Sequence, residues 1–198
     1  MRKFISIVFT LILVFSLSCE IFAKDGQNYY QTVINTKELA DPVVEKMRGY
    51  LYYNLGGMAV GYPYVVDLVS PQDLDKMAPA TYKGMEVGLY KFEQTYHHIY
   101  MINDLAVDDF LGTVAHEFAH AWQTENCPPN QNIVIKEGFA DWVAYKVLQM
   151  DGAINASNNI FYRVDPVYGK GFKIILQVED QRGLAGVLEY VKKTINGE

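Results

Sequence analysis

Apolar residues recur at helical spacing in the first half of the chain and then give way to short runs that favour strands. The spacing of Leu39, Val43, Val44, Met47 and Leu51 predicts a helix over 36–55, which Gly56 and Gly57 end. Residues 62–69, 87–92 and 96–102 are rich in β-branched and aromatic side chains, and we expect three strands there. Between them, Ser70 and Pro71 predict the start of a short helix.

The second half of the chain reads as helical. A stripe along 105–124 predicts a helix capped by Asn103 or Asp104, and its buried face consists of Leu111, Val114, Ala115, Phe118 and Trp122. A second helix is expected over roughly 132–150, and the polar run 152–159 is predicted to be a loop. Two more helices are expected over 168–178 and 184–194. Strands followed by helices indicate an α+β fold.

The amino terminus has the pattern of an export signal. Arg2 and Lys3 precede an apolar run over 5–17, and Ala23 offers a small residue for signal peptidase, which predicts a signal peptide over 1–23. The run is shorter than the roughly 20 residues that span a bilayer, so we expect no transmembrane span. The protein is then secreted or periplasmic. The alternative is lipid modification of Cys19, which gives a membrane-anchored lipoprotein.

Composition narrows the possible partners. The chain has 198 residues, half of them apolar, which is enough for a single domain over 24–198. The net charge is −6 and becomes −7 when Arg2, Lys3 and Glu20 leave with the signal peptide. Such a surface repels nucleic acid and anionic membranes.

The sequence His116-Glu117-Phe118-Ala119-His120 carries the candidate chemistry. Two histidines four residues apart lie on one helix face, where both imidazoles reach one metal ion while Glu117 stays beside it. Catalytic zinc takes three protein ligands, and Glu137 on the next helix is the candidate third. Asp141, one turn further, is a natural hydrogen-bond partner for a metal-bound imidazole.

These motifs resemble the gluzincin metallopeptidases, and most closely the DA-one-like peptidase domain of plant organ-size regulators. The likeness covers roughly 85–195 and includes the Glu137-Gly138 context and the segment 165–172. It implies a zincin-like fold, with a small mixed or antiparallel sheet on the histidine-bearing helix and a following glutamate-bearing helix. It also implies that Asp141 orients His116, and that the strand before the zinc helix offers an exposed edge to an extended peptide.

The predicted activity is hydrolysis of peptide bonds by a zinc-activated water. Glu117 is the expected general base, and Tyr168 is the expected second oxyanion donor because Tyr168-Gly-Lys-Gly resembles the Tyr-x-Lys-Gly of gluzincin aminopeptidases. The Gly-x-Met-Glu-Asn motif of those aminopeptidases is incomplete at 84–87, which favours an endopeptidase acting on peptide or protein substrates.

Two other classes remain open. One is an exported binding module with structural zinc, which calls for a fourth protein ligand. The other is an amidase that acts on a non-protein amide such as a cell-wall cross-link. We predict no catalytic role for His97 and His98, which are expected to be surface or half-buried strand residues.

Overall fold

The computed structural model describes residues 32–78 and 87–195. The predicted signal peptide, Cys19 and the 84–86 part of the incomplete motif lie outside these residues. Every described helix and strand belongs to one compact unit, Val33–Glu198. Among the described helices, none combines the length and the apolar character that crossing a membrane requires.

The amino-terminal half contains the helices and strands expected from its hydrophobic pattern. Helix α2 runs over Lys37–Asn54 and buries Val43, Val44, Met47 and Leu51, as the spacing predicts. Helix α3 runs over Pro71–Met77, and the Ser70 hydroxyl accepts a hydrogen bond from the Asp73 amide at 3.1 Å, which confirms Ser70 as its cap. A two-residue strand, β1 (Val33–Ile34), pairs antiparallel with β5 (Leu105–Ala106).

The main sheet has three strands, β2 (Tyr64–Val69), β3 (Gly88–Glu93) and β4 (Tyr96–Ile102). Their order is β2-β4-β3, with β2 parallel and β3 antiparallel to β4, so the sheet is mixed, which is one of the two forms expected. The expectation that the strand before the histidine-bearing helix has an exposed edge is wrong. Both edges of β4 are hydrogen-bonded, and β3 lies at the edge of the sheet instead.

Four helices follow: α4 (Val107–Asn126), α5 (Ile133–Asp151), α6 (Ile154–Phe161) and α7 (Tyr168–Lys193). Neither Asn103 nor Asp104 caps α4, because Asp104 turns the chain at φ 65° into β5 and the helix starts after Ala106. Gly183, at φ 66° and ψ −176°, divides α7 into the two predicted helices.

The expectation of a loop over 152–159 is wrong from Ile154 onward. Residues 154–159 belong to α6, which buries only Ser157 and Ile160. The Ser157 hydroxyl donates to the Ile154 carbonyl at 2.9 Å and accepts from the Gln149 side chain at 2.7 Å. One buried position of this helix is thus occupied by a serine. Because a helix is recognised in the sequence by apolar residues at its buried positions, the hydrophobic pattern gave no sign of α6.

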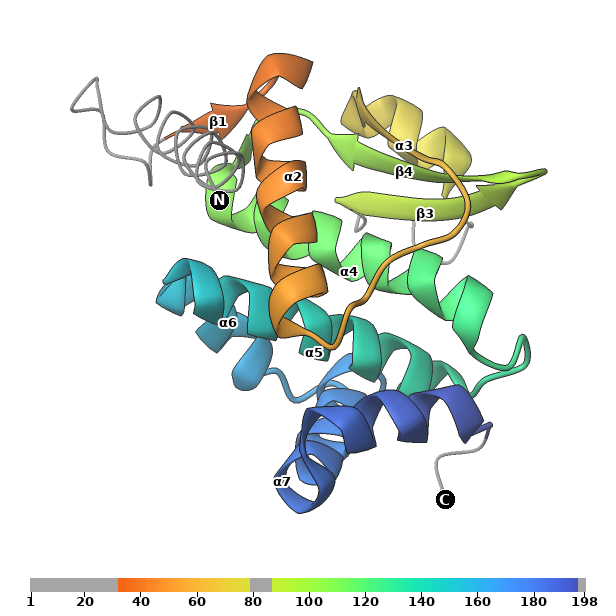
Figure 1. Cartoon of the computed structure of the whole chain (residues 1–198). Coiled ribbons are helices and arrows are strands. Elements are labelled where there is room, and N and C mark those ends of the chain that lie inside the picture. The colour runs from red at the N-terminus through yellow and green to blue at the C-terminus, as the bar shows by residue number, and fades with distance from the viewer. Residues whose placement is uncertain (1–31, 79–86, 196–198) are drawn as a thin grey trace, which may run out of the picture. The chain divides into compact units, whose positions relative to one another are not determined.

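Helix α4 lies between the sheet and α5, and α5 lies between α4 and α7 (Figure 1). Since α4 is covered on two sides, both of its faces are buried: the stripe Leu111, Val114, Ala115, Phe118 and Trp122 is in the core, as predicted. The structure is thus an α+β fold, and its histidine-bearing helix is its central element.

Two glycines bring α5 and α7 into backbone contact. A Cβ on Gly138 would overlap the backbone of Gly171, and a Cβ on Gly171 would overlap the carbonyl oxygen of Val134. Because the atoms in the way belong to the backbone, they cannot move aside as a flexible side chain can. The residue next to Gly138 is Glu137, so this contact helps to set the position of that carboxylate.

We expect Gly138→Ala to lower the free energy of unfolding by about 1–3 kcal/mol, the usual cost of overpacking a core. Chemical denaturation of the variant and the parent measures the difference. Gly49→Ala is the control, because Gly49 lies within α2 with nothing within 4 Å of an added Cβ. That change should stabilise α2 by up to about 1 kcal/mol through helix propensity. Equal stabilities of Gly138→Ala and the parent would contradict the close-contact argument.

Candidate functional site

Three side chains from α4 and α5 converge at one point. The Nε2 atoms of His116 and His120 lie 3.1 Å apart, and each lies 3.2 Å from Oε2 of Glu137. The two histidines are one turn apart on α4, and Glu137 projects from the second turn of α5, which packs across that face. The spacing in the sequence and the crossing of the two helices thus bring the three predicted ligands together.

Each histidine also has a partner on its outer nitrogen. Nδ1 of His116 lies 3.0 Å from Oδ1 of Asp141, and because a carboxylate only accepts, Nδ1 donates. Asp141 is buried and its other oxygen accepts from Arg163 at 2.7 Å. Nδ1 of His120 lies 2.8 Å from Oε1 of Gln123. Both outer nitrogens are engaged, so both Nε2 atoms face Glu137.

The electrostatics of this cluster favour a cation at its centre. Burial would lower the pKa of His116, but the hydrogen bonds with Asp141 and Glu137 outweigh it and raise that pKa to about 10. Burial would raise the pKa of Glu137, but the hydrogen bond from His116 and the neighbouring imidazole of His120 hold that pKa below its usual range. Positive charge is therefore stabilised where the three groups meet.

The donor set fits a metal ion. Two imidazole nitrogens and one carboxylate oxygen lie within 4.8 Å of one another, and no other group of three histidine, cysteine or acidic side chains in the described part of the chain has this arrangement. Nitrogen and oxygen donors of this kind suit zinc and several other divalent ions.

Glu117 lies beside the cluster without belonging to it. Its side chain is buried against the edge strand β3, where a Cβ on Gly88 would lie 3.0 Å from Cγ of Glu117 and 2.6 Å from Cγ2 of Thr113. Glycine at position 88 is therefore what leaves room for the glutamate. Glu117 also lines the adjoining cleft, so its carboxylate can meet a ligand held there.

The cleft has a volume of about 590 Å³ and extends from α4 to the segment between α6 and α7. Its lining includes His116, Glu117, Asp141, Arg163 and Tyr168. The ring centroids of Tyr168 and His116 are 6.1 Å apart, and the guanidinium of Arg163 lies 5.4 Å from the Tyr168 ring centroid. Four of the six site residues expected from the sequence thus line this cleft, and the other two, His120 and Glu137, adjoin it through their contacts with His116.

His97 and His98 lie elsewhere. The expectation of a surface or half-buried position is wrong for His97, which is fully buried between Tyr90, 2.9 Å from its Nδ1, and Glu125, 2.7 Å from its Nε2. The inner face of β4 packs on α4, so a residue pointing there cannot reach solvent. His98 is half-buried on the opposite face, with Nε2 2.7 Å from Asp67.

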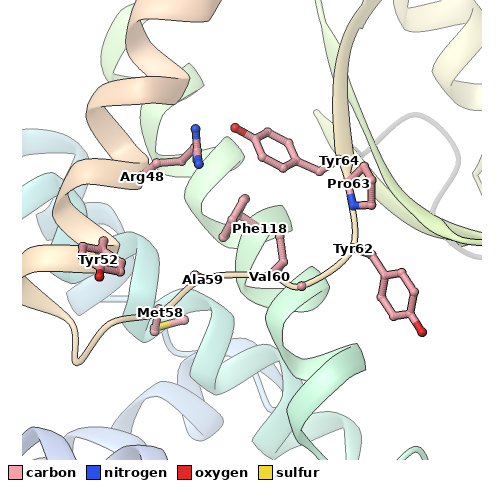
Figure 2. A pocket seen from close by; sticks show the side chains of 10 residues that line it. Arg48, Tyr52, Met58, Ala59, Val60, Tyr62, Pro63, Tyr64 and Phe118 are labelled. Carbon is pink, nitrogen blue, oxygen red and sulfur yellow. The ribbon is translucent and has the colours of Figure 1, made fainter.

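A second crevice, of about 560 Å³, lies between α2 and the segment 58–64. Figure 2 shows Arg48 and Tyr64 pointing toward each other across it, with Phe118 nearby. The guanidinium of Arg48, the charged group in the lining, is already paired with Glu45 at 2.8 Å. Phe118 is two residues from each histidine, and so lies on roughly the opposite side of α4. This crevice brings no reactive groups together.

Sequence reasoning missed three residues of the site: Arg163, Gln123 and Gly88. Gln123 follows His120 by three residues and shares its helix face, a spacing that the sequence does contain. Arg163 and Gly88 come from the α6–α7 connection and from the edge strand, and they reach the site only through the packing of those elements.

Comparisons with models of known protein families, with curated proteins and with solved structures found no match to this chain.

Proposed function

We propose that this chain is an exported zinc-dependent peptidase with a zincin-like fold, similar to the gluzincins. The observation that carries the proposal is the convergence of His116, His120 and Glu137 beside a cleft whose lining includes His116 and Glu117. The arrangement of the elements supports it as well, since α4 packs under a mixed sheet and α5 contributes the glutamate.

Zinc is the proposed metal, held by His116 Nε2, His120 Nε2 and Glu137 Oε2. When bound by three protein ligands, zinc keeps one position open, lowers the pKa of a water there to about 7 and polarises a carbonyl group. An open cleft beside three ligands supports a catalytic site over a structural one, which is closed by four protein ligands.

Glu117 is the proposed general base. Its carboxylate accepts a proton from the attacking water and later donates that proton to the nitrogen of the leaving amine. Burial against β3 restricts the glutamate to a position on the cleft side of α4. Asp141, through its hydrogen bond, keeps the His116 ring in the orientation that points Nε2 toward Glu137.

Tyr168 is the proposed hydrogen-bond donor to the oxyanion that forms at the attacked carbonyl. It is the first residue of α7, and its backbone amide donates to Asp165 at 2.7 Å, which fixes the start of the helix at the wall of the cleft. Arg163 lies against the ring and limits its movement.

Replacing Tyr168 by phenylalanine is therefore expected to lower kcat by about 100- to 1000-fold, as for the loss of one oxyanion donor, with KM little changed. Steady-state kinetics on one cleaved peptide measures both constants. Tyr53→Phe is the control, since Tyr53 is exposed on α2. If Tyr168→Phe raises KM and leaves kcat intact, the hydroxyl acts in substrate binding instead.

The proposal is tested with a mixed library of peptides blocked at both ends, so that internal cleavage alone gives products. We expect cleavage by the protein, loss of cleavage with a chelator, and recovery when zinc is added back. A protein that holds stoichiometric zinc and cleaves no peptide would contradict the proposal. Cleavage of cell-wall amides alone would replace it with the amidase alternative.

A further inference from the structure

The outer nitrogen of His120 is held by a neutral amide, whereas that of His116 is held by a carboxylate. Gln123 Oε1 lies 2.8 Å from His120 Nδ1, and both side chains are buried. A neutral imidazole carries its proton on one nitrogen and accepts on the other. The orientation of the Gln123 amide therefore decides which nitrogen of His120 keeps a lone pair for a metal.

That orientation is set by a backbone carbonyl. Gln123 Nε2 donates to the carbonyl oxygen of Lys136 on α5 at 3.0 Å. A carbonyl can only accept, so the NH₂ end of the amide must face Lys136 and the oxygen end must face His120. Nδ1 of His120 therefore carries a proton, and in the neutral ring Nε2, on the side of Glu137, keeps the lone pair that a metal requires.

A second glutamine extends the chain of hydrogen bonds to the end of α7. Gln123 Nε2 lies 3.3 Å from Gln131 Oε1, and Gln131 Nε2 donates to the carbonyl oxygens of Val191 at 2.8 Å and Thr194 at 3.0 Å. These carbonyls fix the Gln131 amide for the same reason. The backbone carbonyls at the carboxyl end of α7 thus orient the Gln131 amide. Gln131 in turn helps to orient the Gln123 amide, which contacts His120.

We propose that Gln123, oriented by Lys136 and Gln131, is a positioning residue that keeps His120 in the tautomer required to bind zinc. This inference rests on the proposed zinc site. An amide suits the position because the site already contains the carboxylates of Glu117, Glu137 and Asp141, with Arg163 as the cation paired to Asp141. A further buried negative charge would need its own compensation, whereas an amide oxygen orients the ring without adding one.

The test measures zinc binding and the His120 tautomer, with no substrate present. Competition with a chromophoric chelator gives the Kd for Zn²⁺, and nitrogen chemical shifts of the His120 ring in zinc-free protein at mildly alkaline pH report the protonated nitrogen. Gln123→Leu should bind zinc about 10- to 100-fold more weakly, the usual effect of losing an outer partner, and should populate the Nε2-protonated form. Gln149→Leu is the matched control, since Gln149 donates to Ser157 instead.

Gln131→Leu provides a second variant at a less buried position, in case Gln123→Leu does not fold. It should shift the tautomer in the same direction and weaken zinc binding by a smaller factor. A parent protein with His120 protonated on Nε2, or variants with the Kd and tautomer of the control, would overturn the inference. A parent that binds zinc but cleaves no peptide would contradict the proposed function and leave this inference standing.

Discussion

Changing Glu117 to glutamine is expected to remove nearly all peptidase activity while leaving the fold and the zinc content intact. The amide has the size and helix propensity of the carboxylate but cannot accept the proton of the attacking water. General base catalysis contributes about 100- to 10 000-fold, and the loss should lie near the upper limit because the same carboxylate also protonates the leaving amine. The measurement is kcat beside the zinc-to-protein ratio.

Glu189→Gln is the matched control for this variant. It makes the same charge change on an exposed face of α7, where Glu189 pairs with Lys193 one turn away. Its activity and zinc content should equal those of the parent. Full activity of Glu117→Gln with full zinc would disprove the proposed mechanism, and loss of zinc from that variant would mean that Glu117 is itself a ligand.

Changing His120 to alanine is expected to remove the metal and the activity together. The variant keeps two of three ligands and leaves Glu137 Oε2 with His116 as its remaining imidazole partner. Zinc affinity should fall by more than the roughly 100-fold upper value seen when only an outer partner is lost. Elemental analysis after dialysis should then find substoichiometric zinc.

His98→Ala is the control for loss of a histidine side chain. His98 lies on the other face of the sheet, paired with Asp67, and its removal should leave one zinc per protein. Zinc content unaffected by His120→Ala would disprove the ligand assignment. Taken together, the two variants separate the roles: Glu117→Gln loses activity alone, and His120→Ala loses both activity and metal.

The parts of the fold that could be predicted are those in which a local pattern decides the structure. The helices α2 and α4 have apolar residues at helical spacing, and both were expected within about two residues of their observed ends, as was α5, which is buried on most of its surface. The three strands of the main sheet were expected from short local runs of β-branched and aromatic side chains.

The features that could not be predicted depend on contacts between distant segments. That β4 is the central strand follows from its parallel pairing with β2, for which its own sequence has no signal. Helix α6 was missed because it is short and buries a serine, which resembles a loop in a hydrophobic pattern.

The candidate site shows the same division. His116 and His120 are four residues apart on one helix, and Glu137 and Asp141 are four apart on the next, so helical spacing alone places each pair on one face, with Glu117 beside the first pair. Arg163 is 22 residues from Asp141 in the sequence, and only the turn between α6 and α7 brings its guanidinium to that carboxylate. Tyr168 reaches the cleft by the same turn.

The contact between Gly138 and Gly171 limits how this site can evolve. When two side chains are in contact in a core, a substitution that enlarges one can often be compensated by a substitution that makes the other smaller. Evolution can then change both positions. Here neither residue has a side chain left to trim, and the obstructing atoms are backbone. Any inherited change in the placement of Glu137 must therefore arise by moving a whole helix, through substitutions at a distance from both glycines.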